Sequence, residues 1–167
     1  MTNNSFWNNR FIIDKIQPYD KIMIEKIKKA IINLREDNIL SVTLKEIENY
    51  LSDIRTAVRS GRYRIDRNTK RQANMDLFLN YVIDEEKAKE ILLDLKATDF
   101  SEIRQNDHKG YENEMLYIFG KDVKLLERFG RKEKKVSLYI KFNKLENCFV
   151  IVISFHEQRY PIKYYFT

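Results

Sequence analysis

The stretch that decides the fold runs from Val136 to Tyr165 and reads VSLYIKFNKLENCFVIVISFHEQRYPIKYY. Its two apolar runs are rich in β-branched and aromatic residues, and a polar turn, Asn143–Asn147, separates them. We therefore predict two antiparallel strands, Val136–Phe142 and Phe149–Phe155. The second strand leads directly into His156. Because a rigid sheet can hold reactive side chains in fixed geometry at its strand ends, this histidine is the first candidate for a functional site.

Helical patterns precede these strands along the chain. Apolar residues at helical spacing predict helices from Lys21 to Asn33, from Thr43 to Gly61, from Asn68 to Tyr81 and after Asp84. Thr43 and Glu46 match a capping box, and Met115–Phe119 reads as a further strand. Helices followed by a three-stranded antiparallel sheet predict an α+β fold. We expect an N-terminal helical extension over residues 1–42 and the main domain over residues 43–167.

Composition limits the class of protein. The chain has 167 residues, enough for one domain with a core, and 31 Lys+Arg against 25 Asp+Glu give a net charge of +6, which is compatible with a nucleic acid partner. No run of about 18 apolar residues and no apolar leader segment is present, which predicts a cytoplasmic protein without a membrane partner. The single cysteine, Cys148, lies in an apolar run and is expected to be a small buried residue. Two distant histidines offer no metal-ligand spacing, and we expect neither a metal nor another cofactor.

The densest charge lies between Arg55 and Arg71. Arginine has a planar, forked donor group that suits phosphate, and an aromatic ring can stack on an unpaired base. The segment therefore favours contact with RNA; a solvated helix end and a surface for an acidic protein are the alternatives. A second basic group precedes the middle strand. The candidate RNA-binding residues are Arg55, Arg59, Arg62, Tyr63, Arg64, Arg67, Lys70, Arg71 and Lys132.

Alternation along the middle strand places Ser137, Tyr139 and Lys141 on one face. A phenol and an ammonium group two residues apart could clamp a phosphate and stabilise charge that develops on it. The ordinary alternative is a half-buried tyrosine beside a lysine that reaches solvent. His156 can act as general acid or base near neutral pH, and Arg159 is close enough in sequence to join it.

A helix-turn-helix is a further possibility for the segment from Thr43 to Tyr63. TLKEIENYL would form its first helix and IRTAVRSGRY its basic second helix. The chain would then be a DNA-binding regulator built on Lys21–Tyr63. However, the turn would fall at Ser52-Asp53, where there is no glycine, and the apolar stripe continues through it. A single long helix is the favoured interpretation.

Several short sequence motifs follow one another from about Leu51 to Phe155. They are ILLDL at Ile91–Leu95, DF at Asp99-Phe100, LYIFGK at Leu116–Lys121, LYIK at Leu138–Lys141 and VISF at Val152–Phe155. In this order they resemble the MqsR-type toxins, members of the RelE-like superfamily of bacterial toxin–antitoxin ribonucleases.

The resemblance implies a compact α+β fold with a curved antiparallel sheet and metal-independent cleavage of mRNA. It also implies neutralisation by a cognate antitoxin, with the ribosome as a partner to be tested. Tyr139 matches an active-site tyrosine of the family, whereas Glu102 stands where the family has a lysine. We expect a ribonuclease whose catalytic residues are Tyr139, Lys141, His156, Arg104 and Arg159. The alternative is a catalytically inactive module that binds RNA or a protein partner.

Overall fold

The computed structural model describes Lys26 and residues 41–167. The chain divides into residues 1–41 and a compact unit, Val42–Thr167. The helix expected over residues 21–33 lies, apart from Lys26, outside the described residues. In the described part, no helix has both the length and the apolar character needed to cross a bilayer.

Helix α2 (Leu44–Arg59) begins at the predicted capping box. The Thr43 hydroxyl accepts a hydrogen bond from the Glu46 amide at 3.2 Å, and the Glu46 carboxylate accepts one from the Thr43 amide at 2.7 Å. The helix continues through Ser52 and Asp53 without interruption and ends before Gly61, whose φ of 71° suits glycine. The prediction of one helix is confirmed, and the helix-turn-helix alternative is wrong because its turn would lie inside α2.

Two shorter helices and a 3-10 turn follow. They are α3 (Gln72–Asn80), α4 (Glu85–Leu93) and η2 (Ala97–Asp99). The carboxylate of Asp84 caps α4 by accepting a hydrogen bond from the Lys87 amide at 2.7 Å. Helix α3 starts four residues later than its apolar pattern predicts, because Asn68 begins a turn in which its side chain accepts from the Lys70 amide and its carbonyl accepts from the Arg71 amide.

The sheet has five strands and is mixed. The strands are β1 (Tyr63–Ile65), β2 (Phe100–Gln105), β3 (Met115–Leu126), β4 (Glu133–Lys144) and β5 (Val150–Glu157), in the spatial order β1-β5-β4-β3-β2. Strand β1 runs parallel to β5, and every other neighbouring pair is antiparallel.

The α+β class is therefore confirmed, but the prediction of a three-stranded antiparallel sheet is wrong. The three predicted strands are β3, β4 and β5, and the strands at both edges were missed. Strand β1 has only three residues and lies inside the arginine-rich segment, so it is too short and too charged to show an apolar alternation. Its partner on β5 is more than 80 residues away, as the pair Tyr63 and Val150 shows.

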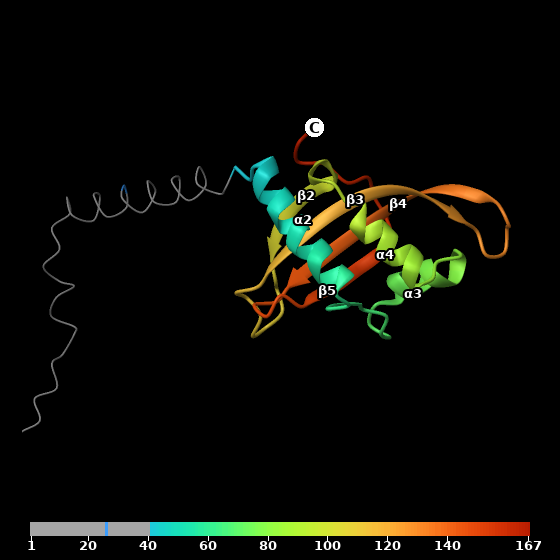
Figure 1. Ribbon diagram of the computed structural model, residues 1–167, viewed down its shortest axis with the longest axis horizontal. Helices are drawn as coiled ribbons and strands as arrows, with labels where there is room; N and C mark the ends of the chain where they lie inside the picture. Colours follow the sequence, from blue (N-terminus) through green and yellow to red (C-terminus); the bar gives the residue numbers. More distant parts are fainter. Residues whose placement is uncertain (1–25, 27–40) are drawn as a thin grey trace, which may run out of the picture. The chain divides into compact units, whose positions relative to one another are not determined.

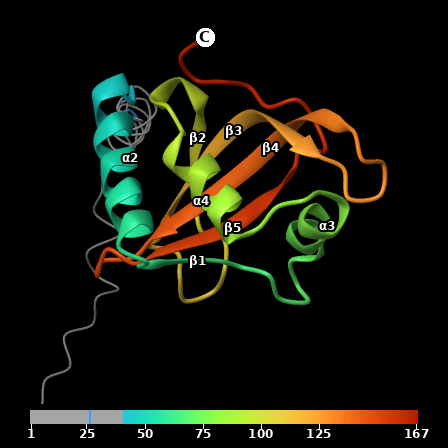
Figure 2. The ribbon, with the colours of Figure 1, turned by 45° about the vertical axis from the view of Figure 1, so that its right-hand side comes forward.

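The helices cover one face of the sheet, as the two ribbon views show (Figure 1, Figure 2). Leu138, Ile140 and Phe142 of β4 point into this core and are fully buried. The ring of Tyr50 from α2 stacks on Tyr117 of β3 at 3.8 Å between centroids. The alternation predicted for the middle strand is confirmed, so the polar side chains of β4 lie on the opposite face.

Cys148 differs from its prediction, because it is exposed rather than buried. It lies in the turn between β4 and β5 with a φ of 59°, and its amide donates to the Leu145 carbonyl at 2.9 Å. The apolar run that seemed to include this cysteine begins only after the turn, at Val150.

Candidate functional site

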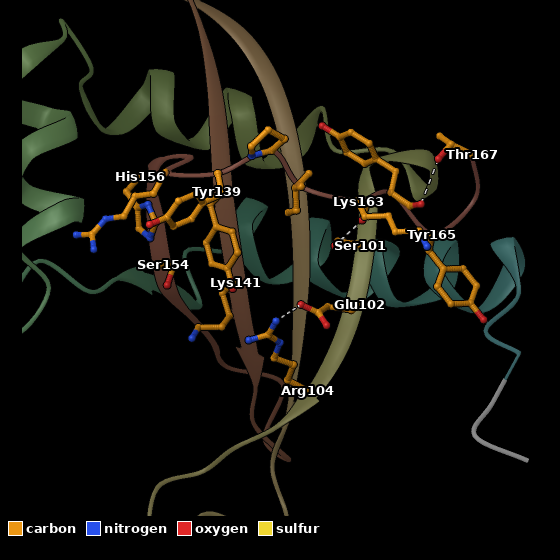
Figure 3. Close-up of a pocket in the computed structure, with 15 residues that line it drawn as sticks. Ser101, Glu102, Arg104, Tyr139, Lys141, Ser154, His156, Lys163, Tyr165 and Thr167 are labelled. Carbon is orange, nitrogen blue, oxygen red and sulfur yellow. Dashed lines mark hydrogen bonds and ion pairs between the residues drawn. The ribbon is translucent and has the colours of Figure 1, made fainter. Parts of the chain in front are cut away.

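A groove with a volume of about 950 Å³ lies on the face of the sheet opposite the helices. Figure 3 shows its side chains in front of the strands, with α2 behind them. All five residues selected from the sequence as catalytic candidates line it: Tyr139, Lys141, His156, Arg104 and Arg159. They come from β2, β4, the end of β5 and the segment that follows it, so the antiparallel pairing brings together positions more than 50 residues apart.

Pairing between β4 and β5 sets the centre of the groove. Tyr139 lies directly opposite His156, and Lys141 lies opposite Ser154. The rings of Tyr139 and His156 stack, with centroids 5.2 Å apart and planes 16° apart. Both rings are therefore held in place by the sheet and by each other, as Figure 3 shows.

The surroundings of His156 favour its neutral form. Its Nδ1 lies 2.9 Å from the backbone carbonyl of Glu157. Because a carbonyl can only accept, the neutral ring carries its proton on Nδ1, which leaves Nε2 free to accept a proton. Burial lowers the pKa of His156, and the nearby charges of Arg159 and Lys141 lower it further, while the bond to Glu157 opposes them. At neutral pH this imidazole is a base.

The other groups make the groove a site for an anion. Burial lowers the pKa of Lys141, as do the neighbouring cations Arg71 and Arg104. Within residues 41–167, Lys141 has no ion pair or hydrogen bond with another side chain. Arg104 pairs with Glu102 at 2.6 Å. Burial raises the pKa of the Tyr139 phenol, which therefore keeps its proton and can donate a hydrogen bond.

The C-terminal segment, residues 158–167, forms one wall of the groove. It crosses the sheet from β5 to the outer edge of β2, where the Tyr165 amide donates to the Phe100 carbonyl at 2.9 Å. The Ser101 hydroxyl donates to the Lys163 carbonyl at 2.7 Å. Gly120 leaves room for the crossing, because a Cβ there would lie 2.6 Å from the Ile162 side chain. This wall was not predicted from the sequence, in which a glycine inside a strand is the one local signal for it.

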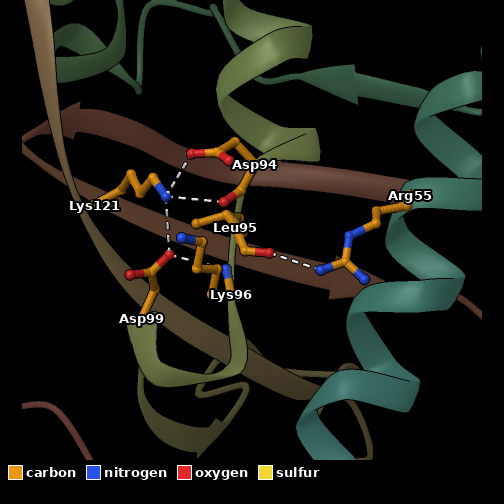
Figure 4. A network of polar contacts seen from close by, with 6 residues as sticks. All are labelled: Arg55, Asp94, Leu95, Lys96, Asp99 and Lys121. Atoms are coloured by element: carbon orange, nitrogen blue, oxygen red, sulfur yellow. Dashed lines mark hydrogen bonds and ion pairs between the residues drawn. The ribbon is translucent and has the colours of Figure 1, made fainter.

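The predicted RNA-binding residues differ in whether their side chains already bond to other groups of the protein. Arg55 is occupied, because it donates to the Leu95 carbonyl at 2.8 Å and pairs with Glu48 at 2.6 Å; Figure 4 shows the contact with Leu95. Arg64 and Arg67 pair with Asp66 and Glu85, and Arg62 bonds to the Ser60 hydroxyl. Tyr63 is half-buried in β1. Arg59, Lys70 and Lys132 are exposed, and Arg71 is half-buried at the start of α3.

Arg71 does not line the groove, but its positive charge lowers the pKa of Lys141, which does. The segment from Arg59 to Arg71 contains β1, which lies at one edge of the sheet. Lys132 lies elsewhere, in the turn between β3 and β4.

Across residues 41–167, no three His, Cys, Asp or Glu side chains are grouped in a way that could hold a metal ion. Comparison of the chain with protein-family models, curated proteins and solved structures found no match.

Proposed function

We propose that this protein is a toxin-type endoribonuclease that cleaves mRNA in the groove by acid–base chemistry without a metal ion. The observation that carries the proposal is the arrangement of His156, whose free Nε2 lies in an anion-binding groove beside Tyr139 and Lys141. A neutral imidazole next to unpaired positive charge is what cleavage at a ribose 2′-hydroxyl needs.

In this mechanism, Nε2 of His156 takes the proton of the 2′-hydroxyl, and the resulting oxygen attacks the adjacent phosphorus. The bond between phosphorus and the 5′-oxygen breaks, which gives a 2′,3′-cyclic phosphate and a 5′-hydroxyl. Tyr139 donates a hydrogen bond to the phosphate, and Arg104 and Arg159 stabilise its charge. Lys141 supplies positive charge, and because its pKa is lowered, its ammonium group is a better proton donor to the leaving oxygen than an ordinary lysine.

The resemblance to MqsR-type and other RelE-like toxins supplies the rest of the proposal. It suggests mRNA as the substrate, the cytoplasm as the place of action, and a cognate antitoxin as the inhibitor. Arg59, Lys70 and Arg71 would follow the RNA backbone along the edge of the sheet toward the groove. Ribosome dependence is part of the test.

A second candidate function is a non-catalytic module that binds RNA or a protein partner through the same surface. The observation in its favour is Glu102, which stands where the related toxins have a lysine and which pairs with Arg104 at 2.6 Å. That carboxylate places negative charge in the groove and occupies one of the proposed phosphate ligands. Such a module would bind its partner equally well after substitution of Tyr139 or His156.

Incubation of the purified protein with mRNA, with and without ribosomes, separates the two functions. We expect the wild type and the control His108→Ala to cut the RNA, because His108 bonds to Asn106 outside the groove. His156→Ala and Tyr139→Phe should lose about 100-fold or more of the rate. Intact RNA in every condition, together with normal growth on expression, would remove the ribonuclease proposal.

A further inference from the structure

Strand β5 does not alternate regularly between the two faces of the sheet. Strict alternation through VIVISFHE would place Val152, Ser154 and His156 on the same face. Instead, Val152 and Phe155 lie in the core, whereas Ser154 and His156 line the groove. The register explains the change, because Phe142 pairs with Val152 and the preceding Lys141 pairs with Ser154, which leaves Ile153 as an extra residue. This β-bulge is what turns His156 toward the groove.

The bulge lies where β5 loses its neighbouring strand. Strand β1 pairs with β5 only as far as Val152, whose carbonyl accepts from the Asp66 amide at 3.0 Å. Beyond that point, a helix rather than a strand packs against this edge of β5, and Figure 2 shows α3 beside it. The backbone groups of Ile153 and Phe155 on this edge therefore need partners that no strand supplies.

Asn74 of α3 supplies both partners. Its Nδ2 donates to the Ile153 carbonyl at 3.1 Å, and its Oδ1 accepts from the Phe155 amide at 2.9 Å. The second proton on Nδ2 goes to the Asp66 carbonyl at 2.6 Å, where the chain leaves β1. The side chain is 1% exposed. A carboxamide has the donor and acceptor of a peptide group, so Asn74 takes the place of the missing strand across the bulge.

We infer that Asn74 is a positioning residue for His156: by bonding to the Ile153 carbonyl and the Phe155 amide, on both sides of Ser154, it holds the bulge that faces the histidine toward Tyr139. The role of Asn74 in placing the ring stands on these contacts alone, and its effect on the reaction rests on the proposed ribonuclease function. Without the carboxamide, two buried backbone groups lose their partners, and the end of β5 must shift or fray to reach water. His156 then leaves the face of Tyr139.

The test measures the imidazole pKa by NMR in Asn74→Asp and Asn74→Ala. The chain has two histidines, so His108 provides an internal reference in the same spectrum. In the wild type the pKa of His156 lies below its ordinary value because the ring is partly buried. We expect it to rise in both variants, and Asn74→Ala, which adds no charge, separates displacement of the ring from the direct effect of a new carboxylate. The side chain in Asn74→Asp has nearly the same size and keeps the acceptor for the Phe155 amide. This variant is therefore expected to fold even if Asn74→Ala does not.

Leu77→Ala is the matched control, because Leu77 lies on the same helix, is 2% exposed and makes no bond to β5 through its side chain. It should lower the stability of the fold without moving the pKa of His156. Folded Asn74 variants in which His156 titrates as in the wild type, with the Phe155 amide still protected from exchange, would overturn the inference.

The rate of RNA cleavage is the second measurement, made below the melting temperature of each variant. Displacement of the base by about 1 Å should lower kcat by about 100-fold, with a smaller change in KM. If the pKa of His156 rises as expected but the wild type cleaves no RNA, the placement by Asn74 stands and the ribonuclease proposal fails. If the wild type cleaves RNA and the Asn74 variants keep both its kcat and its pKa, the inference alone is wrong.

Discussion

At the scale of single residues, the groove separates the roles of its two central titratable groups. Burial and neighbouring cations lower the pKa of both His156 and Lys141. The imidazole is therefore neutral at lower pH than usual, whereas the ammonium group remains charged near neutral pH and loses its proton below its ordinary pKa. A base and an acid are thus present together over a range that includes neutral pH.

The pH dependence of kcat/KM tests this arrangement. On the acid side the rate should fall as His156 becomes protonated, with an inflection below the ordinary pKa of 6.5. On the basic side it should fall with an inflection below 10.5, the ordinary pKa of a lysine. Arg159→Gln removes a cation that lowers the pKa of His156, so the acid inflection should move to higher pH. An acid inflection above 6.5 in the wild type would contradict the assignment.

Lys121 illustrates a residue that contributes to stability rather than to the site. Its ammonium group donates to the Asp94 carbonyl at 2.9 Å and pairs with the carboxylates of Asp94 at 2.8 Å and Asp99 at 3.2 Å (Figure 4). The side chain is 12% exposed. These bonds fix the end of α4 and the turn that leads into β2.

Lys121→Met keeps most of the side-chain length and removes the charge. We expect it to lower the free energy of unfolding by about 2 kcal/mol, because charged hydrogen bonds at a partly buried position are lost. The control is Lys135→Met, since Lys135 also pairs with a carboxylate at 2.8 Å but is 71% exposed. That substitution should change stability much less, because an exposed ion pair is screened by water and contributes little. Equal effects of the two variants in urea denaturation would contradict this interpretation.

At the scale of elements, the C-terminal segment depends on one glycine in β3. Gly120 lies beneath Ile162, and the hydroxyl of Tyr164 would be 2.8 Å from a Cβ at this position. Gly120→Ala should therefore push the segment away from the sheet, widen the groove and expose the amides between residues 162 and 165. Hydrogen exchange measures this directly, and unchanged protection of the Tyr165 amide would show that the segment does not depend on Gly120.

Local patterns predicted the elements that carry a clear period, and tertiary contacts decided the others. The capping box at Thr43 and the alternation along β4 gave α2 and the groove face of the sheet. Strand β2 was missed because Phe100 and Ile103 are its only apolar residues. The bulge in β5 could not be predicted, because it depends on Asn74, about 80 residues earlier in the chain.

The same distinction applies to the candidate site. Four of the five catalytic candidates follow from local properties: Tyr139 and Lys141 from alternation along β4, and His156 and Arg159 from their position at and after the end of β5. Arg104 lies in β2, a strand that was missed, and only the resemblance to the toxins suggested it. By contrast, the arginine-rich segment was selected for its charge alone. Charge does not reveal that Arg55 donates a hydrogen bond to the Leu95 carbonyl. Nor does it reveal that Arg64 and Arg67 form ion pairs with Asp66 and Glu85.

At the scale of the whole molecule, positive charge lies along one edge of the sheet and in the groove. Binding of single-stranded RNA should then weaken as salt rises, with a slope of log K against log salt concentration of about −3 if four phosphates are neutralised. Arg71→Gln should make the slope shallower by about 0.7. Lys45→Gln, on the exposed side of α2, should leave it unchanged. Anisotropy with a 2′-O-methyl oligonucleotide measures binding without cleavage, and an equal slope for both variants would place the RNA elsewhere.

The central claim is that His156 starts RNA cleavage by taking a proton from a 2′-hydroxyl in the groove. The most direct measurement compares His156→Gln with His108→Gln on one defined single-stranded RNA and on its 2′-deoxy counterpart. We predict that His108→Gln cuts the RNA at the wild-type rate and leaves a 2′,3′-cyclic phosphate. His156→Gln should be slower by about 100-fold or more, and the deoxy strand should stay intact. Wild-type cleavage by His156→Gln, or equal cleavage of the deoxy strand, would contradict the account.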